Sequence, residues 1–382
     1  MRILDRYLLT QFVQVFIICF LSFVGLFVVI DAFQHLDRFI DFADTHGSLL
    51  GVMGEYYAYR ALDIFDRMSG VLALIAAMFA ITWLQRHNEM TALEAAGISK
   101  LRIVRPILIT AVSVSLFAAA NRELIIPNCR EQLARDARDL AGQKQHPVVP
   151  CLDHETDIYL GGLQLSMADR RIAGPSFDLP PTLRKHGSKL VAKEAFSLPA
   201  TSNHPRGYLL RGVTAPSQPA ECLSLSVPSL SGNEQIIIFM PCDQRWLKGD
   251  ECFVASNVEF QTLTGNMAGQ RYTSIAGLIR GLHNPSNDFG ADRRVAVHTR
   301  LIQPLMDATL LLLGVPIVLS QNNRNLFMAI GLCLAIVVAF MMVAIACQYL
   351  GNTSLISSAL AAWLPLIIFV PVAVALAEPL RR

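Results

Sequence analysis

Two long stretches without a charged residue constrain this chain more than any other feature. Between Arg6 and Asp31 lie 24 uncharged residues, and between Arg324 and Glu378 lie 53. Roughly 20 apolar residues are enough to cross the hydrocarbon core of a bilayer. The first stretch therefore predicts one membrane-spanning helix. The second is too long for one helix and predicts two, joined by the polar sequence at residues 348–354.

Composition points to the same class of protein. Hydrophobic residues make up 53% of the chain and charged residues 16%, whereas roughly a quarter of an average soluble domain is charged. The net charge is +2, and no block of Lys and Arg is interleaved with aromatic residues. A nucleic-acid partner is therefore not expected.

The hydrophobic pattern predicts six membrane spans in two groups of three. Their predicted positions are about 10–33, 57–85, 104–125, 299–320, 326–348 and 356–377. The apolar N-terminal stretch is too long for a signal peptide and lacks a small-residue cleavage site, so we interpret it as a retained first helix. The second span carries charges in its first turns, which indicates a lining of protein or water there rather than lipid. These charges are Arg60, Asp63, Asp66 and Arg67.

Basic residues predict the orientation of the spans. With a cytoplasmic N-terminus, the inner ends and loops hold nine of them, and the short outer loops predicted at 34–56 and 349–355 hold only Arg38. This bias follows the positive-inside rule. It places both termini in the cytoplasm and the insert at 126–298 outside. The nine are Arg2, Arg6, Arg86, Lys100, Arg102, Arg105, Arg324, Arg381 and Arg382.

The insert at 126–298 has a different character from the spans. It is rich in Pro and Gly, and short segments alternate between apolar and polar residues at 158–160, 163–167, 223–227 and 258–260. Such alternation predicts an antiparallel β-sandwich or a half-open barrel. Near its end, residues 273–282 have apolar side chains at helical spacing, which predicts a short helix leading back to the membrane.

Five cysteines lie in or beside this insert. Cys242 and Cys252 could close a hairpin with a disulfide in an oxidising compartment, or they could be two unrelated buried thiols. The sequence shows no phosphate-binding loop, zinc helix or nucleophile elbow, so we expect neither catalytic residues nor a cofactor or metal site. If the protein moves a substrate against a gradient, another chain must hydrolyse the nucleotide.

Two short segments can form amphipathic helices. In the loop after the second span, Glu89–Ala96 predicts a short helix with Met90 and Leu93 on its apolar side, ended by Gly97. Such a helix could insert into a groove on a soluble partner, with Glu89 or Glu94 meeting a basic residue, or it could be a solvated turn. Residues 1–9 could lie in the membrane interface or form the polar start of the first span.

The order and spacing of several segments resemble the LptF/LptG permeases of lipopolysaccharide export. The resemblance rests on Leu4–Leu8, Asn88–Ser99, Arg300–Leu305 and Leu313–Pro316. It covers both membrane halves, and across 130–270 it rests on layout alone. The second span departs from the family by lacking proline at 63–69, and the basic cluster after the first span is reduced to Arg38.

The resemblance implies an architecture and a set of partners. It implies helices 1–3 within 1–125, a periplasmic β-jellyroll domain at 126–298 and helices 4–6 at 299–382. The implied partners are a second permease of the same family, a two-copy cytoplasmic ABC ATPase, a periplasmic bridge protein with a jellyroll domain, and lipopolysaccharide. The location would be the bacterial inner membrane.

The same resemblance assigns candidate site residues. Glu89 occupies the position of the family's coupling-helix glutamate, so an ATPase contact is implied for it and its neighbours Met90, Leu93, Glu94 and Gly97. Basic residues near the outer rim are candidates to bind lipid phosphate, although they could instead snorkel or pair with Asp63 and Asp66. These candidates are Arg38, Arg60, Arg67 and Arg300.

Other functional classes stay open at this point. A membrane scaffold that displays a β-domain would need no coupling helix, and a related permease could carry a different lipid or a lipoprotein. An ATP-independent transporter would be expected to place ionisable residues near the membrane midplane, and we expect none in the later spans.

Overall fold

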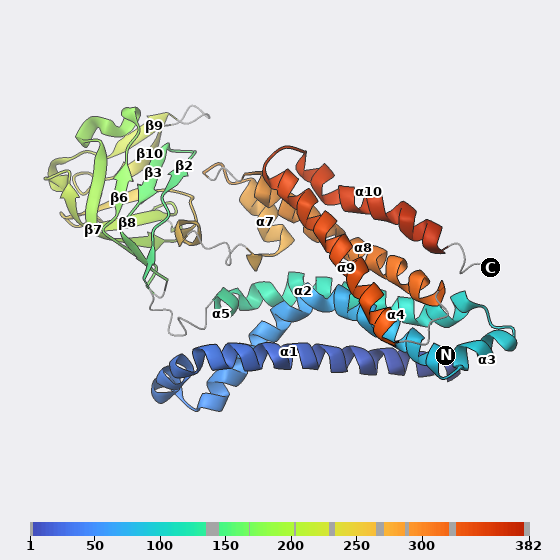
Figure 1. Cartoon of the computed structure of the whole chain (residues 1–382). Helices are drawn as coiled ribbons and strands as arrows, with labels where there is room; N and C mark the ends of the chain where they lie inside the picture. The colour runs from blue at the N-terminus through green and yellow to red at the C-terminus, as the bar shows by residue number, and fades with distance from the viewer. Residues whose placement is uncertain are drawn as a thin grey trace. The chain divides into compact units, whose positions relative to one another are not determined.

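A computed structural model of the chain describes residues 3–134, 145–167, 169–201, 204–228, 234–264, 271–286, 290–320 and 326–377. Within these residues, six helices are long and apolar enough to cross a membrane. The chain divides into a membrane unit, residues 1–133, 273–275 and 290–382, and a β domain, residues 134–272 and 276–289 (Figure 1). The predicted fold class, a helical membrane protein with an inserted β domain, is confirmed.

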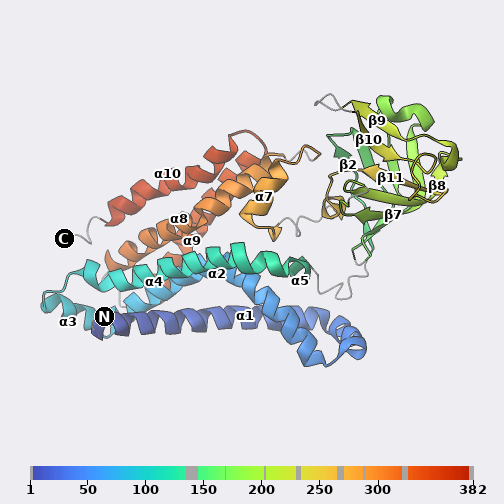
Figure 2. The ribbon, with the colours of Figure 1, turned by 180° about the vertical axis from the view of Figure 1, so that it is seen from behind.

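The first two helices are longer than predicted. α1 (Ile3–His46) has 44 residues and α2 (Leu49–Arg86) has 38. At 1.5 Å per residue, α1 is about 66 Å long, roughly twice the hydrocarbon thickness. Residues 3–9 belong to the same continuous helix as the apolar stretch, and Figure 2 shows this helix from behind.

The predicted outer loop at 34–56 is wrong, because both helices continue through it and only a short turn joins them. Gly47 has a φ of 136°, and the Ser48 hydroxyl caps α2 by accepting a hydrogen bond from the amide of Gly51 at 3.3 Å. His35 and the preceding Asp31 do not end α1, because they bond to each other and to α2. Asp31 contacts His35 one turn later and accepts a 3.1 Å bond from the hydroxyl of Tyr57.

The remaining helices complete the membrane unit. α4 (Lys100–Ala120) continues into a π-helical turn (Asn121–Ile125), a 3-10 turn (Ile126–Cys129) and α5 (Arg130–Ala134). α8 (Ala291–Ser320) contacts α2, α4, α9 (Leu326–Asn352) and α10 (Ser358–Ala377). One continuous apolar core joins side chains of α1, α2, α4, α8, α9 and α10. α8 therefore connects the first three spans to the last two.

Within the described residues, the β domain is an antiparallel sheet of eleven strands. Its main path runs β1–β4–β5–β7–β8–β11–β10–β9, and β6, β3 and β2 branch from β7. The strands are β1 (Gln145–Pro147), β2 (Cys151–Asp153), β3 (Ile158–Gly161), β4 (Gln164–Ser166), β5 (Arg171–Ala173), β6 (Ser176–Asp178), β7 (Lys189–Leu198), β8 (Gly207–Ala215), β9 (Leu225–Pro228), β10 (Glu234–Phe239) and β11 (Glu251–Ala255). The long strands β7 and β8 form its centre, and the branching folds the sheet around its apolar core, as in a jellyroll.

Three of the four predicted strand segments overlap β3, β4 and β9. The fourth, residues 258–260, is not a strand, although its alternation suggested one. The carbonyl of Val258 accepts a 3.0 Å hydrogen bond from the buried hydroxyl of Tyr208, and a 3-10 turn begins at Phe260. This segment thus caps the core. The predicted helix at 273–282 is present as α7 (Ile275–Leu282).

The cysteine pairing considered for the hairpin does not form. Cys242 and Cys252 are both free thiols, the first exposed and the second fully buried. In the β10–β11 register, Ile238 faces Val254 and Phe239 faces Phe253, so Cys252 lies opposite the residue after β10 and not opposite Cys242. Cys252 points into the apolar core of the domain.

Candidate functional site

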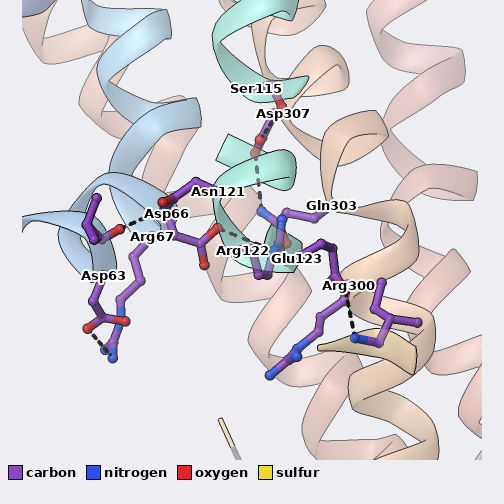
Figure 3. A network of polar contacts seen from close by, with 12 residues as sticks. Asp63, Asp66, Arg67, Ser115, Asn121, Arg122, Glu123, Arg300, Gln303 and Asp307 are labelled. Carbon is purple, nitrogen blue, oxygen red and sulfur yellow. Dashed lines mark hydrogen bonds and ion pairs between the residues drawn. The ribbon is translucent and has the colours of Figure 1, made fainter. Parts of the chain in front are cut away.

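A polar network lies inside the membrane unit, where α2, α4 and α8 meet (Figure 3). Its central carboxylate is Asp307 of α8, whose side chain accepts a 2.6 Å hydrogen bond from Ser115 of α4 and a 3.2 Å bond from Gln303. Asp307 is only 9% exposed and Ser115 only 3%. The network comprises Asp63, Asp66, Arg67, Ser115, Asn121, Arg122, Glu123, Arg300, Gln303 and Asp307.

Gly70 of α2 permits the close approach of Asp307. A Cβ atom at this position would overlap the Asp307 carboxylate, so the contact between α2 and α8 requires a residue without a side chain. Three helices therefore meet at one carboxylate. A buried carboxylate among apolar helices is retained only where hydrogen bonds or charges compensate for its lost hydration.

Ion pairs surround this centre. Arg122 approaches Asp66 at 3.3 Å, and Arg67 contacts Asp63 one turn earlier in α2 at 2.7 Å. Asn121, in the π-helical turn, donates a 3.1 Å hydrogen bond to the carbonyl of Leu62. The π-helical turn thus brings two successive polar residues of the third span against the charged face of α2. Such turns are frequent at functional sites.

Two further members of the network bind the backbone at the start of α7. The carboxylate of Glu123 accepts a 2.8 Å hydrogen bond from the amide of Ile275, and the guanidinium of Arg300 donates to the carbonyl of Thr273. Residues 273–275, at the end of the insert, are thereby held between α8 and the end of the third span within the membrane unit.

The predicted lipid-phosphate candidates fall into different environments. Arg67 is ion-paired with Asp63, as the pairing alternative predicts, whereas Asp66 pairs with Arg122 instead. The guanidinium of Arg60 lies 5.2 Å from the ring centroid of Tyr56 and bonds to its hydroxyl. Arg38 is exposed on α1, and Arg300 belongs to the polar network.

Sequence reasoning missed the centre of this network. The expectation that the later spans hold no ionisable residue near the membrane midplane is wrong, because Asp307 lies near the middle of the fourth span, Asp292–Leu319. Asp307 is the one charged residue between Arg300 and Ser320, and a single charge in an otherwise apolar span could have identified it as a functional candidate. Ser115 and Asn121 carried no such signal, because isolated polar residues are common in apolar helices.

The loop between α2 and α4 forms the second candidate site. It holds α3 (Glu89–Ala95), which begins after Asn88 in a left-handed conformation. Met90 is buried in the core of the membrane unit, and Leu93 and Ile98 pack beside it. These apolar residues hold α3 against the chain's own helices. The opposite face is exposed and consists of Thr91, Ala92, Glu94, Ala95 and Ala96.

Hydrogen bonds fix both ends of α3. The amides of Gly97 and Ile98 donate to the carbonyls of Glu94 and Leu93, at 2.9 and 3.0 Å, and the φ of 78° at Gly97 explains why a glycine ends the helix. At the other end, the hydroxyl of Tyr7 lies 3.3 and 3.4 Å from the two carboxylate oxygens of Glu89. The first helix of the chain therefore contacts the start of α3.

The family model for the lipopolysaccharide export system permease LptF/LptG matches residues 6–150 and 253–378, which include α3, the first span from Arg6 onward and the other five spans in full. A search of curated proteins gave no significant match. The matched segments cover more than half of the chain. The chain therefore belongs to the LptF/LptG family of lipopolysaccharide export permeases, which are inner-membrane transport proteins and not enzymes.

Proposed function

We propose that this chain is one of two permease subunits of an ABC transporter that extracts lipopolysaccharide from the inner membrane and passes it to a periplasmic bridge. The observation that carries the proposal is the family match over both groups of spans. A second permease would complete the transport path, and two copies of a cytoplasmic ATPase would supply the energy. The chain shows no phosphate-binding loop of its own, which is consistent with a separate ATPase.

Within this proposal, α3 is the contact with the ATPase. Its buried side, Met90 and Leu93, joins it to the core of the spans, so a displacement of α3 would be passed to them. Its exposed side is free of bulky groups apart from Glu94, which suits insertion of a short helix into a groove. Glu89 lies at the edge of this face, partly exposed, with Tyr7 beside it.

We further propose that α3 and both termini lie in the cytoplasm and that residues 126–298 lie outside. The excess of basic residues on one side of the spans supports this orientation. A cysteine label near residue 200 should react with a membrane-impermeant reagent added to the periplasm. A label at Ser99 should react only after the inner membrane is opened. Reversed accessibility would refute the orientation.

The outer vestibule is proposed to bind the phosphates of the lipid through Arg38, Arg60, Arg67 or Arg300. Charged groups near span ends can face a hydrated vestibule at modest cost. Arg38 is the most accessible test, because it is exposed on α1. Its neighbours Leu36 and Ile40 are also exposed and can carry photocrosslinking residues.

We expect these crosslinkers to capture lipopolysaccharide, and Arg38→Gln to reduce the yield several-fold without separating the subunits. Asp37→Asn, an adjacent exposed change of charge, serves as the matched control and should leave the yield unchanged. Equal capture of bulk phospholipid, or an unchanged yield in Arg38→Gln, would mean that Arg38 only positions its charge at the membrane surface.

A further inference from the structure

Two cysteines of the β domain approach each other at the edge of the sheet. Cys222 follows the 3-10 turn Pro219–Glu221, has an extended backbone (φ −83°, ψ 137°) and leads into β9. Cys242 follows β10, two residues after Met240. β9 and β10 pair in antiparallel register, with Leu225 opposite Ile238. The residues before β9 therefore lie beside the residues after β10.

Ser224 fixes this arrangement. Its hydroxyl accepts a 3.0 Å hydrogen bond from the amide of Met240 and donates a 2.6 Å bond to the carboxylate of Asp243. The thiol of Cys222 donates a 3.4 Å hydrogen bond to the carbonyl of Gln218, four residues earlier. A rotation of this side chain away from Gln218 would direct the thiol toward the neighbouring turn that contains Cys242.

The two thiols also differ from the buried cysteine of the domain. Burial raises the pKa of Cys222, and nearby Glu221 and the Cys242 thiol raise it further. Both are free thiols in this structure, Cys222 half-buried and Cys242 exposed, so an oxidant can reach both. Burial in the core raises the pKa of Cys252 to about 12, which leaves it almost without thiolate.

We propose that Cys222 and Cys242 form a disulfide bond, which would covalently link the segment before β9 to the segment after β10. The oxidant is a disulfide, either a small molecule such as oxidised glutathione or the disulfide of a thiol oxidoreductase. One thiolate attacks the incoming disulfide and releases one thiol, and the second cysteine then attacks the mixed disulfide and releases the other. The two protein thiols lose two electrons and two protons, and the oxidant becomes two thiols.

A bond at this position would restrain an edge strand of the sheet. β9 ends the main path of the sheet, and within the described residues β10 is its only strand partner. Edge strands are prone to fraying and to pairing with other chains. A disulfide between residues 222 and 242 would close the segment that contains both strands and restrict its unfolded conformations. The pair would therefore hold the edge strand in place.

The test uses the full chain in detergent, so the chemistry is measured independently of the proposed orientation. The protein is treated with oxidised glutathione, free thiols are alkylated under denaturing conditions, and peptides are mapped before and after reduction. We expect a peptide pair linked through Cys222 and Cys242, and a melting temperature for the β domain that rises by several degrees on oxidation. Cys222→Ser and Cys242→Ser should each abolish both effects, and Cys252→Ser, the matched control, should retain the linked pair.

Alkylation of both thiols after oxidation, or separate glutathione adducts on Cys222 and Cys242, would overturn the proposal. The same mapping on cells rapidly quenched with acid tests the compartment. A pair linked in cells supports both the pairing and the outside location. A pair that links in detergent but stays reduced in cells supports the pairing and contradicts the outside location of the β domain.

Discussion

Replacing Glu89 with lysine is expected to stop lipopolysaccharide export while leaving the membrane unit folded. Glu89 is partly exposed at the first turn of α3, where its carboxylate can meet a basic group of the ATPase while Met90 anchors the helix. A carboxylate that docks on a partner's arginine makes a charge-assisted hydrogen bond. Leaving that arginine without its partner in a desolvated groove costs on the order of 2–5 kcal/mol of binding free energy. A lysine adds repulsion to this loss.

The measurement has two parts. Copurification of the ATPase with the tagged chain reports binding, and lipopolysaccharide release to a periplasmic acceptor reports coupling. We expect Glu89→Lys either to lose the ATPase or to retain it without export. A membrane scaffold would copurify no ATPase even with the native sequence. A Glu89→Lys complex that binds the ATPase and exports at the normal rate would refute the role.

Glu94 and Tyr7 provide matched controls for this experiment. Glu94 lies on the same helix, is exposed, and approaches Lys100 at 3.7 Å, so Glu94→Lys makes the same change of charge away from the Tyr7 contact. We expect it to reduce export less than Glu89→Lys does. Tyr7→Phe removes the hydroxyl that contacts Glu89 and keeps the ring. It should lower export only modestly, because the Glu89 charge remains.

The two candidate sites differ in how far the sequence predicts them. α3 is a local structure, and its amphipathic pattern and the glycine at its end were visible in a run of twelve residues. The sequence did not predict that Met90 is buried in the core of the spans, because this depends on α1 and α2. Local patterns predict helices well and their tertiary partners poorly.

The polar network is the opposite case. The bond between Ser115 and Asp307 joins residues 192 positions apart, and no local pattern links a serine in one apolar span to an aspartate in another. The same limit explains the error over residues 34–56. The charges there suggested a loop, but Asp31 and His35 bond within α1, and Tyr57 of α2 completes the contact. A charge favours solvent only where no partner is available.

The central carboxylate of the network should be the most sensitive position in the membrane unit. Asp307→Leu removes the acceptor for Ser115 and Gln303 and directs a branched side chain toward Gly70 of α2. Each buried polar group left without a partner costs about 1–3 kcal/mol. We expect a large fall in thermal stability in detergent and loss of export.

Asp307→Asn distinguishes the effect of the charge from that of the hydrogen bonds, because it removes the negative charge and keeps a hydrogen-bond acceptor. An asparagine has nearly the same shape, and its amide oxygen can still accept from Ser115, so stability should fall less than in Asp307→Leu. Asp292→Leu is the matched control, because Asp292 lies exposed in the first turn of the same helix. Its effect should stay within about 1 kcal/mol, the usual range for a charge at a helix end. Comparable losses in both leucine variants would mean that Asp307 has no special part in joining the helices.

A double-mutant cycle with Ser115→Ala tests whether the 2.6 Å bond itself joins α4 to α8. Groups that share a hydrogen bond couple by about 0.5–3 kcal/mol, whereas distant groups contribute additively. In the native protein, Ser115→Ala leaves the carboxylate with one donor fewer and should be destabilising. In Asp307→Leu the serine has already lost this acceptor, so the same substitution should cost much less. If Ser115→Ala costs the same in both backgrounds, the serine and the aspartate act independently, and their hydrogen bond does not join the two groups of spans.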